Sequence, residues 1–94
     1  MLKELNPLLH SELRLGIISI LMGVEEADFT FLKEQTGATS GNLSVQLDKL
    51  LKSNYIEIEK SFVGKKPKTV CRMTQTGKDA FEEYVKVLKE YLKV

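Results

Sequence analysis

Two short helical runs that are joined by only three residues constrain this chain more than any other feature. Residues 31–36 follow Thr30, a residue type that often caps helix N-termini, and precede Gly37, which is typical of a helix end. After residues 38–40, apolar side chains recur at the spacing of one buried helical stripe: Leu43, Leu47, Leu50 and Leu51. The spacing predicts two helices that meet across a tight turn, the second over residues 40–53 with Thr39 or Ser40 as its N-cap.

Other patterns predict the elements on either side of this pair. Residues 11–22 are apolar on almost every side of a helix, and Pro7 favours a short helix just before them. Residues 55–59 alternate with period two, residues 63–68 interrupt the pattern, and residues 69–74 resume it, which predicts a hairpin with a long basic tip. An amphipathic helix follows from Gly77 and runs nearly to the C-terminus.

The length of 94 residues favours one domain over residues 1–94, with 43% apolar residues available for its core. One cysteine, Cys71, and one histidine, His10, exclude an internal disulfide and a usual Cys/His zinc site, so we expect no metal and no cofactor. The apolar stretch over residues 13–24 is shorter than the roughly 20 residues of a membrane span. No secretory signal is recognised, and a cytoplasmic location without membrane contact is expected.

An enzyme is the first function class that the residue inventory argues against. The chain has one histidine and one cysteine, no glycine-rich phosphate loop after a strand, and no nucleophile and base that spacing would bring together. We therefore predict no catalytic residue.

The charge of the chain is unevenly distributed. Its 14 basic and 13 acidic residues nearly cancel, but residues 49–72 hold seven basic against two acidic side chains, a net charge of +5. A phosphate backbone attracts such a cluster and releases counterions on contact. A lysine-rich loop that only keeps the protein in solution explains the charge equally well.

Several segments together resemble small winged helix-turn-helix transcriptional regulators of the MarR and ArsR types. The similarity covers roughly residues 8–92 and lies in residues 28–37, 41–50, 55–57, 64–69 and 74–81. It implies a mainly α fold with a small β-hairpin (α+β), in the order helix-helix-helix-strand-wing-strand-helix. It also implies sequence-specific binding of double-stranded DNA, with the helix over residues 40–53 in the major groove and the wing, residues 63–69, on the backbone or minor groove. Asp48 and Cys71 depart from the family pattern, which commonly has a basic and an aromatic residue there.

The resemblance implies two groups of DNA-binding residues. The candidates for reading base edges are Ser40, Asn42, Ser44, Val45 and Gln46, among which Asn42 and Gln46 have amides suited to adenine. The candidates for backbone or wing contacts are Thr30, Lys49, Lys52, Lys65, Lys66 and Lys68. Polar residues also face solvent on any amphipathic helix, and the alternative role of Thr30 and Ser40 is helix capping.

The last helix, within residues 75–94, carries more apolar surface than one small core needs. With leucines near the N-terminus it forms the predicted interface of a homodimer that reads an inverted repeat: Leu5, Leu8, Leu9, Phe81, Tyr84, Val85, Leu88, Tyr91 and Leu92. The alternatives are that this helix covers its own domain, and that the chain is a winged-helix protein-interaction module without DNA binding. Nothing in the sequence supports a small-molecule effector or identifies the operator.

Overall fold

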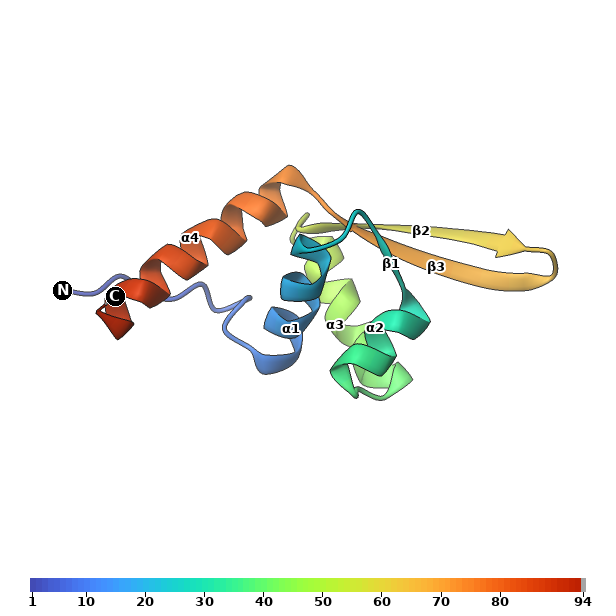
Figure 1. Cartoon of the computed structure of the whole chain (residues 1–94), viewed down its shortest axis with the longest axis horizontal. Coiled ribbons are helices and arrows are strands. Elements are labelled where there is room, and N and C mark those ends of the chain that lie inside the picture. Colours follow the sequence, from blue (N-terminus) through green and yellow to red (C-terminus); the bar gives the residue numbers. More distant parts are fainter. Residues whose placement is uncertain (94) are drawn as a thin grey trace.

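The computed structural model describes residues 1–93, which form four helices and a three-stranded sheet. The elements are α1 (Glu12–Met22), β1 (Ala27–Asp28), α2 (Phe29–Thr36), α3 (Ser40–Lys52), β2 (Ile56–Val63), β3 (Lys66–Met73) and α4 (Gln75–Leu92). Helices α1, α2 and α3 gather in the middle, while the β2–β3 hairpin and α4 extend in opposite directions (Figure 1). The predicted α+β fold and its order of elements are confirmed, with one strand added. The final helix ends at Leu92, and Val94 lies outside the described residues.

The added strand, β1, completes an antiparallel sheet in the order β1-β3-β2. Its two residues pair with the base of β3, Ala27 opposite Cys71 and Asp28 opposite Val70. A second difference concerns Pro7, because residues 7–9 form only a turn and not the predicted short helix. The Asn6 side chain closes that turn by accepting a hydrogen bond from the Leu8 N–H at 2.9 Å.

The ends of α2 and α3 have defined caps. Asp28, not the predicted Thr30, caps α2, since its Oδ1 accepts from the Phe31 N–H at 2.8 Å. The pairing of Asp28 with Val70 holds it extended, as an N-cap requires, so the helix begins two residues earlier than predicted. Thr39 caps α3 by accepting from the Asn42 N–H at 3.1 Å, which confirms one of the two expected caps.

The hairpin has a shorter tip than the sequence suggests. β2 extends to Val63 and β3 begins at Lys66, so only Gly64 and Lys65 connect them, and the prediction of a long loop over residues 63–68 is wrong. Gly64 has a φ of 65°, the positive value that the first position of a two-residue type II′ turn needs. Pro67 is tolerated because it lies beyond the reach of β1. The hairpin formed by β2, Gly64, Lys65 and β3 is called the wing below.

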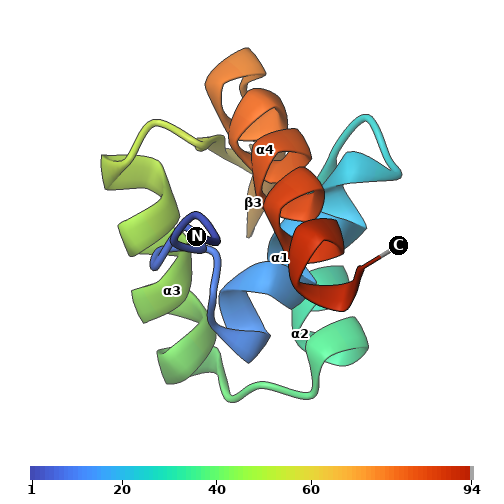
Figure 2. The same ribbon diagram turned by 90° about the vertical axis from the view of Figure 1, so that its left-hand side faces the viewer.

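One hydrophobic core joins the three central helices to the base of the sheet. α1 lies between α3 and α2, with α4 above it (Figure 2). The fully enclosed side chains come from the N-terminal segment, α1, α2, α3 and the sheet, and they include Leu9, Ile17, Ile18, Leu32, Leu43, Leu50, Ile56 and Cys71. The N-terminal segment is tied to α4, because His10 Nδ1 lies 3.0 Å from the Tyr84 hydroxyl and Tyr91 Oη donates to the Lys3 carbonyl at 2.6 Å. Three leucines of the predicted α3 stripe are buried, and Leu51 is exposed.

Burial of Cys71 makes the fold less stable at alkaline pH. Desolvation raises the pKa of its thiol from 9.0 to about 11. Between these values the unfolded chain loses the proton while the folded chain keeps it, so the free energy of unfolding falls as pH rises, by at most about 1.4 kcal/mol per pH unit. We expect the stability difference between the wild type and Cys71→Ala, measured by urea unfolding, to shrink from pH 9 upward. A constant difference up to pH 10.5 would contradict this assignment.

Candidate nucleic-acid interface

The face of α3 that turns away from the core carries most of the predicted base-reading residues. Ser40, Asn42, Ser44 and Val45 are exposed, and Val45 retains 52% of its surface. Leu43, Leu47 and Leu50 anchor the opposite side of the helix in the core. The first two turns of α3 therefore present small polar groups and one branched apolar side chain to solvent.

Gln46 differs from the other candidates because it is only partly exposed and its amide is engaged. Its Oε1 accepts from Arg14 Nη1 at 2.5 Å, and its Nε2 donates to Asn42 Oδ1 at 3.0 Å. Arg14 in turn donates from Nε to the Leu8 carbonyl at 2.6 Å. A chain of hydrogen bonds thus runs from the segment before α1 to the first turn of α3.

The predicted backbone-contacting residues lie on three neighbouring elements. Lys49 and Lys52 are exposed in the last turns of α3, where Lys52 pairs with Asp48 at 2.9 Å. Lys65, Lys66 and Lys68 are exposed on the wing. Thr30, in the first turn of α2, lines a surface hollow together with Lys66 and Lys68, so the fold brings these distant residues together.

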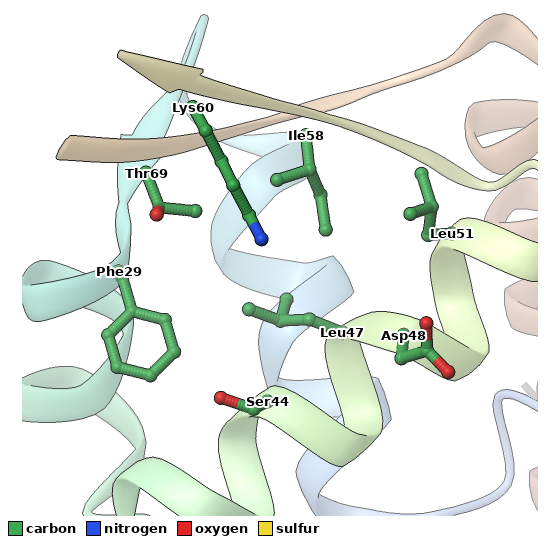
Figure 3. A pocket seen from close by; sticks show the side chains of 8 residues that line it. All are labelled: Phe29, Ser44, Leu47, Asp48, Leu51, Ile58, Lys60 and Thr69. Carbon is green, nitrogen blue, oxygen red and sulfur yellow. The ribbon is translucent and has the colours of Figure 1, made fainter. Parts of the chain in front are cut away.

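A second hollow separates α3 from the wing, and Lys60 reaches into it (Figure 3). Its floor includes Leu47 and Ile58, and Ser44 and Asp48 of α3 lie along one side. Lys60 belongs to the basic cluster of residues 49–72 but is not among the predicted site residues. The signal was present, because period-two alternation puts residue 60 on the same side of β2 as the core residues 56 and 58.

Two apolar side chains at the end of the wing were also not predicted as site residues. Phe62 and Val63 are exposed over 74% and 63% of their surfaces. Phe62 lies opposite Pro67 and Val63 opposite Lys66 in the β2–β3 register. The end of the wing therefore combines lysines with an uncovered aromatic ring.

Arg72 contributes less free positive charge than the sequence count implies. Its Nη2 lies 2.9 Å from Glu59 and 3.0 Å from Glu26. The hydrogen bonds to Glu59 and then to Glu26 raise the pKa of the guanidinium above its ordinary value. Arg72 therefore joins the segment before β1 to the hairpin and is not an open phosphate ligand.

The residues predicted for a dimer interface fall into two groups. Leu9 and Tyr84 are buried in the core of the chain itself, which the sequence reading did not anticipate. The remaining seven are half-buried or exposed along α4 and the N-terminal segment: Leu5, Leu8, Phe81, Val85, Leu88, Tyr91 and Leu92. Phe81 and Val85 border a hollow that Met22 of α1 completes.

Residues 1–93 lack a metal-binding cluster and a membrane-spanning helix. In that part of the chain, no cluster of three or more His, Cys, Asp or Glu side chains is arranged to hold a metal ion. The helices of the same residues include none that is long and apolar enough to cross a membrane.

Known proteins are similar to this chain in sequence and in fold. An uncharacterized protein of Methanocaldococcus jannaschii is 36% identical over 76 residues, which are 81% of this chain and 83% of that protein. A transcriptional regulator homologue from Pyrococcus horikoshii superposes with a TM-score of 0.84 at 24% identity, covering 92% of this chain and 85% of the other. A mutant of MarR from E. coli, solved with operator DNA, superposes with a TM-score of 0.73 at 16% identity, covering 85% and 56%.

The fold is therefore that of MarR-type transcriptional regulators. The profile of a protein family, described as a winged helix DNA-binding domain, matches residues 13–92. That match covers α1 to α4, including α3 and the wing. The chain belongs to this family of winged helix DNA-binding domains.

Proposed function

We propose that this protein is a sequence-specific, double-stranded DNA-binding transcriptional regulator that acts as a homodimer on an inverted repeat. Helix α3 enters the major groove, and the wing contacts the backbone or the adjacent minor groove. The protein has no catalytic activity of its own and works in the cytoplasm. The single observation that carries the proposal is the continuity of one surface. α3, the start of α2 and the wing border one hollow, and the start of α2 and the wing border a second hollow that shares Phe29 and Thr69 with the first.

The side chains on this surface suit two kinds of DNA contact, to base edges and to phosphates. Ser40, Asn42, Ser44 and Val45 offer hydroxyl, amide and methyl groups that suit base edges, with Gln46 behind them. The lysines of the wing and of α3 suit phosphates, which fix the protein on DNA without reading sequence. Thr30 at the start of α2 adds a hydroxyl and the backbone amides of a helix N-terminus.

Two further features fit the end of the wing to a minor groove. Minor-groove proteins often combine basic side chains with an apolar wedge. Phe62 pairs with Pro67 across the hairpin, and the side chain of Phe62 is exposed. Lys60 precedes Phe62 by two residues on β2, and Lys66 and Lys68 flank Pro67 on β3. Phe62 therefore joins the proposed contact residues.

Seven of the nine predicted interface residues leave apolar surface exposed, which supports a homodimer. Among them Leu5, Leu8, Phe81 and Leu88 also pack partly against the core of their own chain, whereas Val85, Tyr91 and Leu92 lie outside that cluster. Leu92 and Tyr91 expose 63% and 41% of their surfaces at the end of α4, and Phe81, Val85 and Leu88 continue this surface toward α1. A second copy that covers α4 puts two α3 helices on one side of the dimer by two-fold symmetry. This arrangement matches an inverted repeat.

The proposal is tested by selecting DNA from a random duplex library at about 50 mM salt, where phosphate contacts are strong. We expect an inverted repeat to be selected. By sedimentation equilibrium we expect a dimer that Leu92→Glu converts to monomers. Val63→Glu is the matched control, because Val63 has the same 63% exposure on the wing and should leave the dimer intact. A monomer that selects no DNA would instead favour the protein-interaction alternative.

A further inference from the structure

We propose that Arg14 is a positioning residue that fixes which edge of Asn42 faces the DNA. As a result, the first turn of α3 offers hydrogen-bond donors, and it selects base edges that accept them. This inference rests on the proposed function and adds a specificity rule to it.

The argument starts from the chemistry of arginine, whose guanidinium has five N–H donors and no acceptor. The atom of Gln46 that faces Arg14 must therefore be the acceptor Oε1, at 2.5 Å from Nη1. The NH₂ group of Gln46 then points to the other side, where it donates to Asn42 Oδ1 at 3.0 Å. The side-chain amides of Gln46 and Asn42 thus each have one possible orientation.

The remaining free groups follow from that orientation. With its Oδ1 turned to Gln46, Asn42 leaves its NH₂ group for a ligand, and Asn42 is exposed while Gln46 is half-buried. The side chain that meets DNA is therefore Asn42, and Gln46 acts through it. Reversing the Asn42 amide would bring two NH₂ groups together and lose the hydrogen bond.

Arg14, which anchors this series of hydrogen bonds, is held independently of α3. Arg14 is half-buried, and its Nε donates to the Leu8 carbonyl at 2.6 Å. The backbone of Asn42 is held as well, because its N–H donates to Thr39 Oγ1 at 3.1 Å. The relay Arg14–Gln46–Asn42 thus begins at a backbone carbonyl and ends on a residue whose own backbone is held by the N-cap Thr39, which favours one presentation of the Asn42 amide.

The outward NH₂ group of Asn42 can distinguish among bases, because it can only donate hydrogen bonds. Guanine presents O6 and N7, and thymine presents O4, as acceptors in the major groove. Adenine presents the acceptor N7 beside its donor amino group, and it can still pair with Asn42, because an amide oxygen that accepts one hydrogen bond keeps a second lone pair. Cytosine offers only a donor amino group, which opposes the NH₂ of Asn42. We therefore expect a base that presents an acceptor, and not cytosine, at the position that Asn42 contacts.

Gln46→Glu provides a test because it reverses the polarity of the relay. A carboxylate accepts from Arg14 and cannot donate, so Asn42 has to turn its NH₂ group inward and present Oδ1 outward. Selection from a random library should then admit cytosine and disfavour guanine and thymine at one position of each half-site, because the outward Oδ1 needs an amino group that donates. The expected change of preference at that position is on the order of tenfold or more.

Three controls separate this switch from simple damage. Gln35→Glu introduces the same charge beside the hollow that Asn42 lines and should lower affinity without changing the selected base. Asn42→Ala should abolish the preference, and adding Gln46→Glu to it should restore none. Arg14→Met should relax the preference while the circular dichroism spectrum shows a folded chain, and Arg14→Lys should restore part of it.

The outcomes distinguish failure of this inference from failure of the proposed function. If the wild type selects no sequence, the proposed function itself fails. If the wild type selects an inverted repeat and Gln46→Glu leaves every base preference unchanged, the relay does not set specificity. A uniform loss of affinity in Asn42→Ala, without any change in base preference, would assign Asn42 to a phosphate and overturn the proposal.

Discussion

Gly77→Ala is expected to destabilise the protein by about 3 kcal/mol or more, because overpacking against backbone leaves little room for adjustment. A Cβ at this position would lie 2.1 Å from the Tyr55 carbonyl oxygen and 2.8 Å from Met73 Cε. Neither the helix nor the Tyr55 segment moves freely. Thr74 joins them through its N–H to the Tyr55 carbonyl at 3.1 Å and its hydroxyl to the Asn54 carbonyl at 2.6 Å.

The measurement is urea unfolding followed by circular dichroism, and Gly16→Ala is the matched control. Gly16 also lies inside a helix, but a Cβ there meets nothing within 4 Å. Alanine at that position should stabilise the protein by about 0.5–1 kcal/mol through helix propensity. The two glycines therefore predict opposite signs for the same substitution, and equal effects would refute the close packing of α4 on Tyr55.

Replacing Lys65, Lys66 and Lys68 together by alanine is expected to lower DNA affinity on the order of 100-fold at 0.1 M salt. If each lysine neutralises one phosphate, the slope of log affinity against log salt concentration should decrease in magnitude by roughly 2.7. The loss should be similar for the selected operator and for random DNA, since phosphate contacts carry no sequence information. Fluorescence anisotropy titrations at several salt concentrations measure both quantities.

The control removes the same charge from outside the wing. Lys3, Lys78 and Lys93 are exposed on the N-terminal segment, in the first turn of α4 and at its C-cap. Their triple alanine variant should bind DNA with nearly the wild-type slope. A slope that falls equally in both variants would mean that net charge, and not the wing, drives the attraction.

Periodicity predicted the long elements of the fold well, but it did not predict features that depend on only a few residues. The leucines of α3 and the alternation of Ile56 and Ile58 report a buried face directly. β1 has only two residues, so it has no period to detect. The N-cap of α2 was misassigned because Asp28 and Thr30 are both capping types, and pairing with Val70 selects Asp28.

The candidate site was predicted in outline by the same reasoning. Exposure of Ser40, Ser44 and Val45 follows from their position opposite the leucine stripe. The engagement of Gln46 does not, because Arg14 lies 32 residues away within an apolar helix. The burial of Leu9 and Tyr84 also required the tertiary structure, since an apolar stripe alone does not say which neighbour covers it.

The attachment of the wing has a mechanical consequence. At its base the hairpin is held by β1 on one edge of β3 and by Arg72 between Glu26 and Glu59. Residues 60–68 are all exposed, so in the part of the chain that the structure describes only the two strands themselves stiffen this stretch. The wing is thus held at one end only, and a two-stranded hairpin without further packing is marginally stable. In the proposed complex we therefore expect its end to adjust to grooves of different width while α3 keeps its register. Base requirements should then be strict at the centre of a half-site and relaxed at its outer edge.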